Sequence, residues 1–316
     1  MAADALISIV IPVYNRATLV NRTLNSIAAQ TLRPLNIILV DNNSTDNTLA
    51  VLTRWKEENE TDSFKISVLQ ERQPGAACAR NCGLKAVTTP YVMFFDSDDT
   101  MSVGHTQNIH HAIAENPDAD IIGWDITMHN IDGSTAKKKC HIKKPLFNHI
   151  FHSSLATQRY IVKTDFLAAA GAWNGSVLGW NDYELGIRLL LHEPIFKHID
   201  VCDSVHVFCQ QESITGTDFA SSPEKWEYAL DCCTKSIESY AQKNAILWIE
   251  VRRCILAGMY AKEGDKINSQ RLLGEVLDRT ASTYHHQFFK FITRFISAGG
   301  RGVAILTRLF LTPKIK

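Results

Sequence analysis

Short apolar runs alternate with segments of helical period between residues 6 and 124. The apolar runs are a few residues long and rich in Ile, Val and aromatic residues, which is typical of buried strands. The segments between them repeat apolar residues every three or four positions, as amphipathic helices do. This alternation indicates right-handed βαβ units, so we predict an α/β fold with a mostly parallel central sheet flanked by helices. The predicted strands are 6–13, 37–40, 66–69, 91–95 and 121–124, and the predicted helices are 17–30, 44–58, 76–86 and 104–115.

The pattern changes after residue 125. Residues 125–151 have no clear period and carry several lysines, so a solvated loop or an edge hairpin is expected there. A helix is predicted over 182–191, and the chain has a helical pattern from about residue 223 onward. We therefore predict a domain of residues 1–220 and a helical C-terminal region of residues 221–316.

The last part of the chain is basic. No acidic residue follows Asp278, whereas Lys290, Arg294, Arg301 and Arg308 have the spacing of one helix face. Gly299-Gly300 is expected to divide this segment into two helices. A basic amphipathic end favours contact of residues 285–316 with an anionic membrane surface, and a helix packed on the domain core is the alternative.

Composition excludes several classes of protein. The formal net charge is +0 and the pI is about 7.2, so there is no overall basic footprint for nucleic acid. The apolar run at 6–13 is interrupted by Pro12 and has no basic flank, so no signal peptide is expected. No apolar run approaches the roughly 20 residues that span a bilayer. The 8 cysteines are scattered without a Cys-x-x-Cys pair, which favours reduced structural thiols.

An acidic cluster follows the predicted strand 91–95 and consists of Asp96, Ser97, Asp98 and Asp99. Open α/β sheets bind ligands at the carboxyl ends of their strands. Three carboxylates within four residues repel one another, and a divalent cation that bridges a diphosphate would relieve this repulsion, since oxygen ligands suit Mg²⁺ and Mn²⁺. A solvated acidic turn is the alternative.

Three further segments accompany this cluster. The first predicted strand leads into PVYNR at residues 12–16, the second ends in VDNNSTDNT at 40–48, and GAACARNCG at 75–83 precedes the fourth. In this order and spacing, the four segments resemble glycosyltransferase family 2 over about residues 6–215. The resemblance implies a GT-A fold, which is Rossmann-like, with a C-terminal helical extension. It also implies inverting transfer of a sugar from a nucleotide-diphosphate donor, with a UDP-sugar expected, to a glycan or lipid-linked acceptor hydroxyl in cell-surface polysaccharide assembly.

The resemblance assigns a donor site to these segments. Asp41 would accept a hydrogen bond from the imide N–H of a uracil-type base, and a carboxylate makes this bond charge-assisted. Arg80 would offer a planar fork of donors to the ribose or diphosphate, and Gly75 would let the backbone pass close to the donor. The alternatives are a helix or turn cap for Asp41, a solvated helix residue for Arg80 and a simple loop glycine for Gly75. The expected donor-binding residues are Pro12, Tyr14, Arg16, Asp41, Asn43, Gly75, Arg80, Asn81, Asp96 and Ser97.

A metal site follows from the same resemblance. Asp98 is expected to ligate Mn²⁺ or Mg²⁺ directly. His206 lies before a Ser-Ile-Thr end and is expected as a further metal ligand or a contact to the diphosphate, with a structural histidine as the alternative.

The expected catalytic base is Asp182. GWNDYEL at residues 179–185 resembles the family's Glu-Asp segment at the start of an acceptor-side helix. Asn181 departs from this pattern, because the family more often has Glu there and Asn cannot act as a base. Glu184 is the reserve, although its spacing to Arg188 favours an ordinary ion pair on a helix surface. The alternative for Asp182 is a carboxylate that the helix dipole stabilises.

Other functions fit the sequence less well. A sugar-nucleotide pyrophosphorylase would need a glycine-rich basic loop after the first strand, and a dehydrogenase would need Gly-x-Gly-x-x-Gly there, whereas the chain has PVYNR. A catalytically silent nucleotide- or glycan-binding relative that acts as a scaffold remains the alternative, supported by Asn181. The family and the basic tail together predict an enzyme that is cytoplasmic and peripheral on the cytoplasmic face of a membrane.

Overall fold

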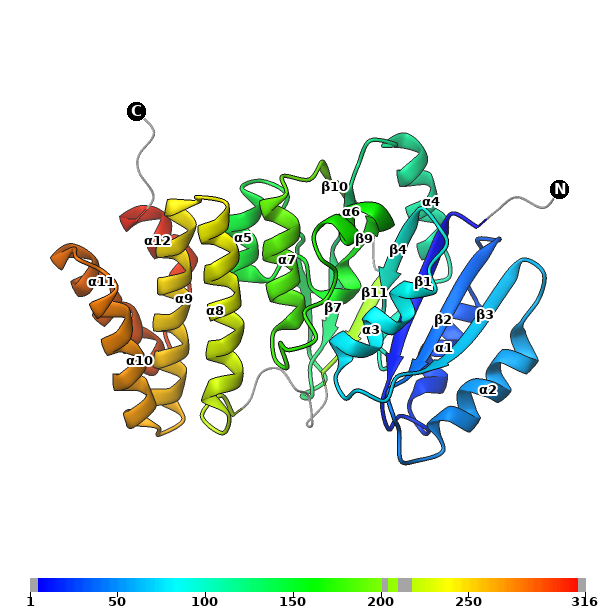
Figure 1. Ribbon diagram of the computed structural model, residues 1–316, viewed down its shortest axis with the longest axis horizontal. Helices are drawn as coiled ribbons and strands as arrows, with labels where there is room; N and C mark the ends of the chain where they lie inside the picture. Colours follow the sequence, from blue (N-terminus) through cyan, green and yellow to red (C-terminus); the bar gives the residue numbers. More distant parts are fainter. Residues whose placement is uncertain (1–4, 201–203, 210–217, 312–316) are drawn as a thin grey trace.

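The computed structural model describes residues 5–200, 204–209 and 218–311 (Figure 1). Its centre is a seven-stranded sheet with the order β10-β6-β9-β4-β1-β2-β3. The pairs β1–β2, β2–β3, β1–β4 and β6–β10 are parallel, and β9 is antiparallel to both β4 and β6. The strands are β1 (Ile7–Val13), β2 (Leu35–Asp41), β3 (Phe64–Gln70), β4 (Tyr91–Phe94), β6 (Ile121–Trp124), β9 (Tyr160–Lys163) and β10 (Phe196–Ile199).

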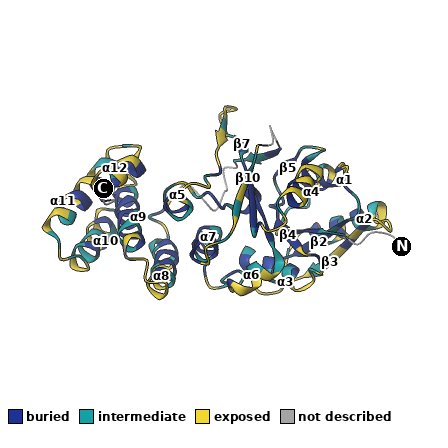
Figure 2. Cartoon of the chain, turned by 90° about the horizontal axis from the view of Figure 1, so that it is seen from above, coloured by how far each residue is buried: buried dark blue, intermediate teal, exposed yellow. Residues whose placement is uncertain are grey.

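Helices cover both faces of this sheet (Figure 2), which explains why β1, β2, β4 and β6 are almost continuously apolar. The helices α1 (Val20–Ala28), α2 (Thr48–Asn59) and α4 (His105–Glu115) share one core with the sheet. The helices α3 (Ala76–Lys85), α6 (Thr164–Ala169) and α7 (Asn181–Leu191) share the core on the other face. The predicted α/β fold is confirmed.

A second, four-stranded sheet has the order β5-β11-β7-β8. Its strands are β5 (Thr100–Met101), β7 (Ile126–His129), β8 (Thr135–Lys138) and β11 (Val205–Phe208). The antiparallel pair β7–β8 is the edge hairpin expected after residue 125. Because β11 pairs with β5, this sheet brings His206 opposite Thr100, directly after the acidic cluster.

The C-terminal region is helical, as predicted. It consists of α8 (Pro223–Ser239), α9 (Lys243–Lys262), α10 (Lys266–Asp278), α11 (Thr283–Ser297) and α12 (Val303–Phe310). The helix α9 lies at its centre and contacts α8, α10 and α11. The helix α5 (Pro145–His152) packs on both α7 and α9, and α8 packs on α7, so the helical region lies directly against the sheet domain. The division at residues 220 and 221 stays a prediction.

The basic tail forms two helices, because Gly299 and Gly302 take positive φ values of 84° and 89°. The four basic residues therefore do not share one helix face, and that prediction is wrong. The alternative to membrane contact is a tail helix packed on the protein core. It holds for part of the tail, since Phe288, Phe289 and Ile292 are buried in one core with residues of α9. Among the described residues, no helix is long and apolar enough to cross a membrane.

Candidate active site

Side-chain hydrogen bonds join the loops that follow β1 and β2. The backbone N–H of Asn15 donates to Ser44 Oγ at 3.0 Å, and that of Arg16 donates to Thr48 Oγ1 at 2.9 Å. The N–H of Ala17 donates to Asp46 Oδ2 at 3.2 Å. The sequence predicts that this helix begins at residue 44. Because these polar side chains accept hydrogen bonds from the backbone of the first loop, α2 begins at Thr48.

Asp41 ends β2 with a carboxylate that is almost fully buried, since the residue is 1% exposed. Its Oδ2 accepts the N–H of Ser44 at 3.3 Å, and its Oδ1 has no hydrogen-bond partner among the described residues. A buried carboxylate oxygen without a donor is costly, so this atom points to a ligand that supplies one. Near it in the sheet register, half-buried Pro12 pairs with Val40 of β2. Tyr14 and Asn43, which follow the ends of β1 and β2, are exposed, and Asn43 has a φ of 59°.

Asn42 positions the loop that carries Gly75. Its side-chain amide donates to the carbonyl oxygens of Glu71 and Gln73, and its Oδ1 accepts the N–H of Gly75 at 2.8 Å. Gly75 has a φ of 121°, which favours glycine, and it caps α3. Sequence reasoning did not assign a role to Asn42, although it stands between Asp41 and Asn43 in the same polar run.

The acidic cluster is held by a few polar contacts. Asp96 Oδ1 accepts a hydrogen bond from Arg80 Nη2 at 2.7 Å, and Asp96 Oδ2 accepts one from Gln158 Nε2 at 2.5 Å. Gln158 Nε2 also contacts Asp99 Oδ2. Asp99 Oδ1 accepts the N–H of Phe208 at 3.0 Å. Burial raises the pKa of Asp99 to about 8, and the negative charges of Asp96 and Asp98 add to this rise. Both oxygens of Asp99 thus accept a hydrogen bond within the protein. Ser97 is buried in the same turn.

The chemistry of this cluster fits a divalent cation. Burial raises the pKa of Asp98, and the negative charge of Asp96 raises it further. The guanidinium of Arg16 lies 3.8 Å from Asp98 Oδ2 and offsets only part of this effect. Carboxylate oxygens are ligands that Mg²⁺ and Mn²⁺ prefer, and a cation would stabilise the ionised form. In residues 5–200, 204–209 and 218–311, no three Asp, Glu, His or Cys side chains converge to hold a metal by themselves. A diphosphate bound there would supply further oxygen ligands to a cation.

His206 lies on β11 at the side of this cluster. Its Nδ1 is 2.9 Å from Nε2 of His129, and the next-but-one residue, Phe208, donates its N–H to Asp99. The guanidinium of Arg22 lies 3.8 Å from the centre of the Phe208 ring. The fold thus brings His206 to the acidic cluster, and its role as a metal ligand stays a prediction.

Arg80 connects the acidic cluster to the start of α7. Besides Asp96, its guanidinium contacts Asn181 Oδ1 at 3.1 Å and lies 4.4 Å from the centre of the Trp173 ring. Asn81 exchanges two hydrogen bonds with the backbone of Trp173, at 2.8 and 3.1 Å. Asn81 therefore positions the loop before α7 in this structure, and its contact with a donor stays a prediction.

Asp182 lies in the first turn of α7, and its Oδ1 accepts the N–H of Tyr183 at 2.8 Å. Burial raises the pKa of Asp182, whereas the charge of Arg80 lowers it and that of Asp96 raises it. A raised pKa makes the ionised carboxylate a stronger base. Tyr160 was not expected here. Burial and the charge of Asp182 raise its pKa, and its Oη has no partner in the described part of the chain.

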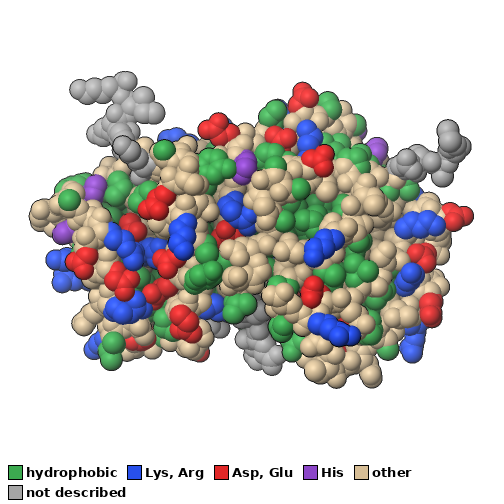
Figure 3. All heavy atoms as spheres, viewed as in Figure 1, with side chains coloured by type: hydrophobic (Ala, Val, Ile, Leu, Met, Phe, Trp, Pro, Cys, Tyr) green, Lys and Arg blue, Asp and Glu red, His purple; other side chains and the backbone are tan. Residues whose placement is uncertain are grey.

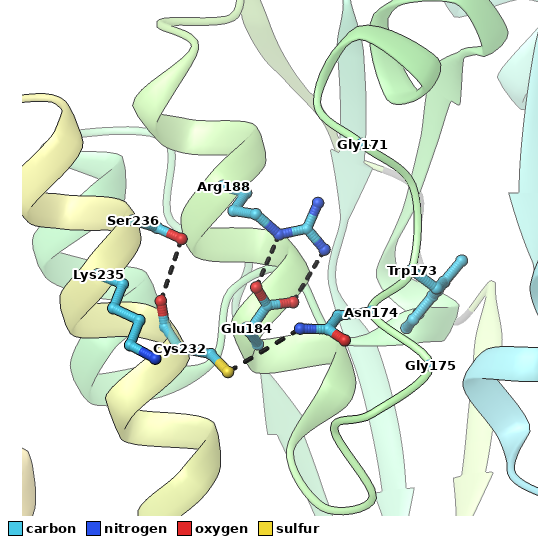
Figure 4. A pocket seen from close by; sticks show the side chains of 9 residues that line it. All are labelled: Gly171, Trp173, Asn174, Gly175, Glu184, Arg188, Cys232, Lys235 and Ser236. Carbon is cyan, nitrogen blue, oxygen red and sulfur yellow. Dashed lines mark hydrogen bonds and ion pairs between the residues drawn. The ribbon is translucent and has the colours of Figure 1, made fainter.

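Glu184 faces a different environment (Figure 4). Its two carboxylate oxygens accept Arg188 Nε and Nη2 at 2.7 and 2.8 Å, and Arg188 also donates to the carbonyl oxygens of Ala170 and Ala172. The ion pair expected from the sequence is confirmed, but it is largely buried instead of lying on the helix surface. It lines a cavity of about 460 Å³ between the loop 171–175, α7 and α8. Because both carboxylate oxygens are bonded to Arg188, Glu184 is poorly suited as a reserve base.

Glu184→Gln should lower the free energy of unfolding by about 3 kcal/mol, because it leaves the largely buried Arg188 without its carboxylate. The matched control is Glu115→Gln, whose ion pair with His111 is exposed on both sides, so a loss below about 0.5 kcal/mol is expected. Urea unfolding measures both variants. Equal losses would contradict the structural role of the Glu184–Arg188 pair.

Comparisons with known proteins agree on one family. A family model described as glycosyl transferase family 2 matches residues 8–170. Glycosyltransferase GlyA of Streptococcus pneumoniae is 32% identical over 115 residues, which cover 36% of this chain and 16% of GlyA. The Escherichia coli UDP-Glc:alpha-D-GlcNAc-diphosphoundecaprenol beta-1,3-glucosyltransferase WfaP is 38% identical over 94 residues, which cover 30% of this chain and 36% of WfaP. The chain thus matches well under two thirds of the length of these curated relatives.

Among solved structures, the crystal structure of S. aureus TarS 1-349 in complex with UDP-GlcNAc has a similar fold. Its TM-score is 0.69 at 17% sequence identity, and the match covers 98% of this chain and 93% of that one. This likeness includes the C-terminal helices as well as the sheet domain, and it supports the GT-A fold.

Proposed function

The chain belongs to glycosyltransferase family 2, and we propose that it transfers a sugar from a nucleotide-diphosphate donor to an acceptor hydroxyl with inversion at the anomeric carbon. The contact of Arg80 with both Asp96 and Asn181 carries this proposal. Through this one side chain, the carboxyl ends of the central strands adjoin the first turn of α7. A donor held at the carboxyl ends of the strands would present its anomeric carbon toward Asp182, which lies in the first turn of α7.

In the proposed reaction, the carboxylate of Asp182 takes the proton of the acceptor hydroxyl. The acceptor oxygen then attacks the anomeric carbon from the face opposite the diphosphate, and the bond from that carbon to the diphosphate oxygen breaks. A positioned base of this kind contributes typically about 10²–10⁴-fold to the rate. Arg80 lies within hydrogen-bond distance of Asp96 and would add positive charge near the leaving diphosphate.

We assign the metal site to Asp98, with His206 as the second candidate ligand. Mn²⁺ or Mg²⁺ bound there would neutralise charge that develops on the leaving diphosphate. The raised pKa of Asp98, which burial and Asp96 cause, supports this assignment, because a nearby cation would favour its ionised form.

The donor is proposed to be a UDP-sugar, of the hexose or N-acetylhexosamine type. The unpartnered, buried Oδ1 of Asp41 supports this proposal, because it would accept the imide N–H of uracil. WfaP is named as a transferase that uses UDP-Glc, and the similar TarS structure is a complex with UDP-GlcNAc, so both agree with this donor class. Donor binding is assigned to Pro12, Tyr14, Arg16, Asp41, Asn43, Gly75, Arg80, Asn81, Asp96 and Ser97.

The acceptor is proposed to be a glycan or a lipid-linked saccharide in cell-surface polysaccharide assembly. The relative WfaP, whose name includes a diphosphoundecaprenol acceptor, supports a lipid-linked substrate. An enzyme with such an acceptor would work at the cytoplasmic face of a membrane. Residues 285–316 would contribute to membrane contact, since they carry exposed basic residues and no acidic ones.

A scaffold that binds nucleotide without turnover remains the second candidate, supported by Asn181. In this structure, however, Asn181 accepts Arg80, so its amide has a positioning role that needs no basicity. The scaffold predicts that donor binding occurs without any transfer or hydrolysis.

Asp41→Asn tests the proposed donor class. The substitution keeps the shape and removes the charge, so the affinity for UDP should fall about 10- to 100-fold. The control is Asp62→Asn, whose carboxylate is fully exposed in the turn before β3 and should not affect UDP binding. Calorimetric titration measures both. Unchanged UDP affinity in Asp41→Asn would overturn the assignment of Asp41 to the base.

A further inference from the structure

Two basic segments that lie far apart in the sequence meet on one side of the molecule. One is the segment from β8 into α5, which carries Lys138, Lys139, Lys143 and Lys144, and the other is α12 with Arg308. In Figure 2, α5 lies between α12 and the hairpin that contains β7.

Direct contacts tie α12 to α5. The guanidinium of Arg308 donates to Asn148 Oδ1 at 2.7 Å and lies 4.8 Å from the centre of the Phe147 ring. Both residues belong to α5. The position of Arg308 is therefore fixed on α5, the helix that follows Lys143 and Lys144 in the chain.

The positive groups of this region lie within electrostatic reach of one another. The rings of His141 and His152 are 5.5 Å apart. Burial lowers the pKa of His152, and the positive charges of His141, Arg308, Arg252 and Lys138 lower it further. Because a lowered pKa favours the neutral form of His152, the lysines and Arg308 are the groups that create a positive potential here, and such a potential attracts anions.

Little negative charge offsets this potential. Lys138, Lys139, Lys143 and Lys144 are exposed, and no carboxylate in the described ranges forms an ion pair with them. The neighbouring Asp125 is bonded to His198 at 2.9 Å. The face of the C-terminal helices in Figure 3 differs, because basic and acidic side chains intermingle there. On α10, for example, Arg271 pairs with both Glu227 and Glu275.

Exposed apolar side chains adjoin these charges on α12. One side of the helix is buried through Val303, Ala304 and Thr307. The opposite side exposes Ile305 and Leu309, one turn apart, at 64% and 67%. Exposed apolar residues next to basic ones are typical of a helix that lies in a membrane interface. Water would otherwise surround this pair at a free-energy cost.

We propose that this surface, which consists of Lys138, Lys139, Lys143, Lys144, Ile305, Arg308 and Leu309, lies on an anionic lipid bilayer. The lysines and Arg308 contact acidic headgroups, and Ile305 and Leu309 enter the boundary of the acyl chains. An anionic polysaccharide would match the charges but would leave the apolar pair exposed, so the bilayer fits both features. The sequence of residues 285–316 alone suggests a membrane contact by the tail. The proposed surface extends this contact to the segment from β8 into α5.

Binding to vesicles tests this proposal. The wild-type protein should sediment with vesicles of phosphatidylserine and phosphatidylcholine, and not with vesicles of phosphatidylcholine alone. Raised salt should release it, because salt screens exposed charges. The loss of one positive charge near an anionic surface costs about fivefold in partitioning, so Lys139→Glu/Lys143→Glu should reduce binding at least about 30-fold.

Matched controls separate this surface from net charge and from general hydrophobicity. Lys262→Glu/Lys266→Glu makes the same charge change at the turn between α9 and α10. In Figure 1 this turn lies at the end of the two helices that is away from α12. This variant should bind vesicles as the wild type does. Ile305→Ser/Leu309→Ser should weaken binding, whereas Ile267→Ser, at a position 81% exposed, should not. Point variants are needed because deleting residues 285–316 would remove Phe288, Phe289 and Ile292 from the core.

Wild-type binding by Lys139→Glu/Lys143→Glu would overturn the proposal. The proposal would also be overturned if Ile305→Ser/Leu309→Ser bound vesicles as the wild type does and a soluble anionic polysaccharide displaced the protein from vesicles. That result would identify a polyanion as the partner. Sugar transfer to a water-soluble acceptor should be unchanged in every one of these variants. A failure of the membrane proposal is thereby distinguishable from a failure of the proposed catalytic function.

Discussion

Asp182→Asn should keep the affinity for the nucleotide-sugar donor and lose sugar transfer, with kcat reduced about 10²–10⁴-fold. The amide has the shape of the carboxylate but cannot take the acceptor proton. It can still accept the N–H of Tyr183, so the first turn of α7 should stay folded. Donor affinity by calorimetry and initial rates at saturating donor measure the two effects separately.

The matched control for this variant is Asp165→Asn. Asp165 also lies in the first turn of a helix, but it is exposed on α6 and away from the acidic cluster. It should transfer sugar at the wild-type rate. Undiminished transfer by Asp182→Asn would remove Asp182 from the role of base, and Glu184 would be the next candidate to test despite its pairing with Arg188.

Asp98→Ala should abolish the part of donor binding that depends on a divalent metal. Changes in groups that only support a metal ligand already cost about 10–100-fold in affinity, so the loss of a direct ligand should cost at least this much. Binding without metal should change little. Titration of UDP with and without Mn²⁺ measures the difference between the two conditions.

This variant should not lose stability. Burial and the charge of Asp96 raise the pKa of Asp98, so its ionised form is unfavourable in the folded state and its removal relieves repulsion. Asp118→Ala is the control, since Asp118 is an exposed carboxylate in the turn after α4. If Mn²⁺ still strengthens UDP binding in Asp98→Ala as it does in the wild type, the metal assignment is wrong.

Within the central sheet, β1, β2, β4 and β6 could be predicted because they are buried on both faces. In β1, six of seven residues are fully buried and the seventh partly, so the whole strand appears as one apolar run. The segments that carry polar residues after β1, β2 and β4 were also predictable, because polar residues interrupt the apolar pattern abruptly there.

Other features had no readable signal. The strand β9 is four residues long and antiparallel in a mostly parallel sheet, and neither its length nor its direction follows from periodicity. Gln158 contacts both Asp96 and Asp99, but it comes from the segment before β9, more than fifty residues along the chain. The later start of α2 depends on hydrogen bonds to the loop after β1, which only the folded chain brings near.

The most direct test of the account is a calorimetric titration of the wild-type protein with UDP, GDP and dTDP, each with and without Mn²⁺. Asp41 and Asp98 are the two residues on which the donor assignment depends. The account predicts that UDP binds and that Mn²⁺ strengthens this binding, whereas GDP binds weakly. A preference for GDP or dTDP would contradict the proposed UDP-sugar donor. No binding of any nucleotide, with or without metal, would contradict the proposed enzyme itself.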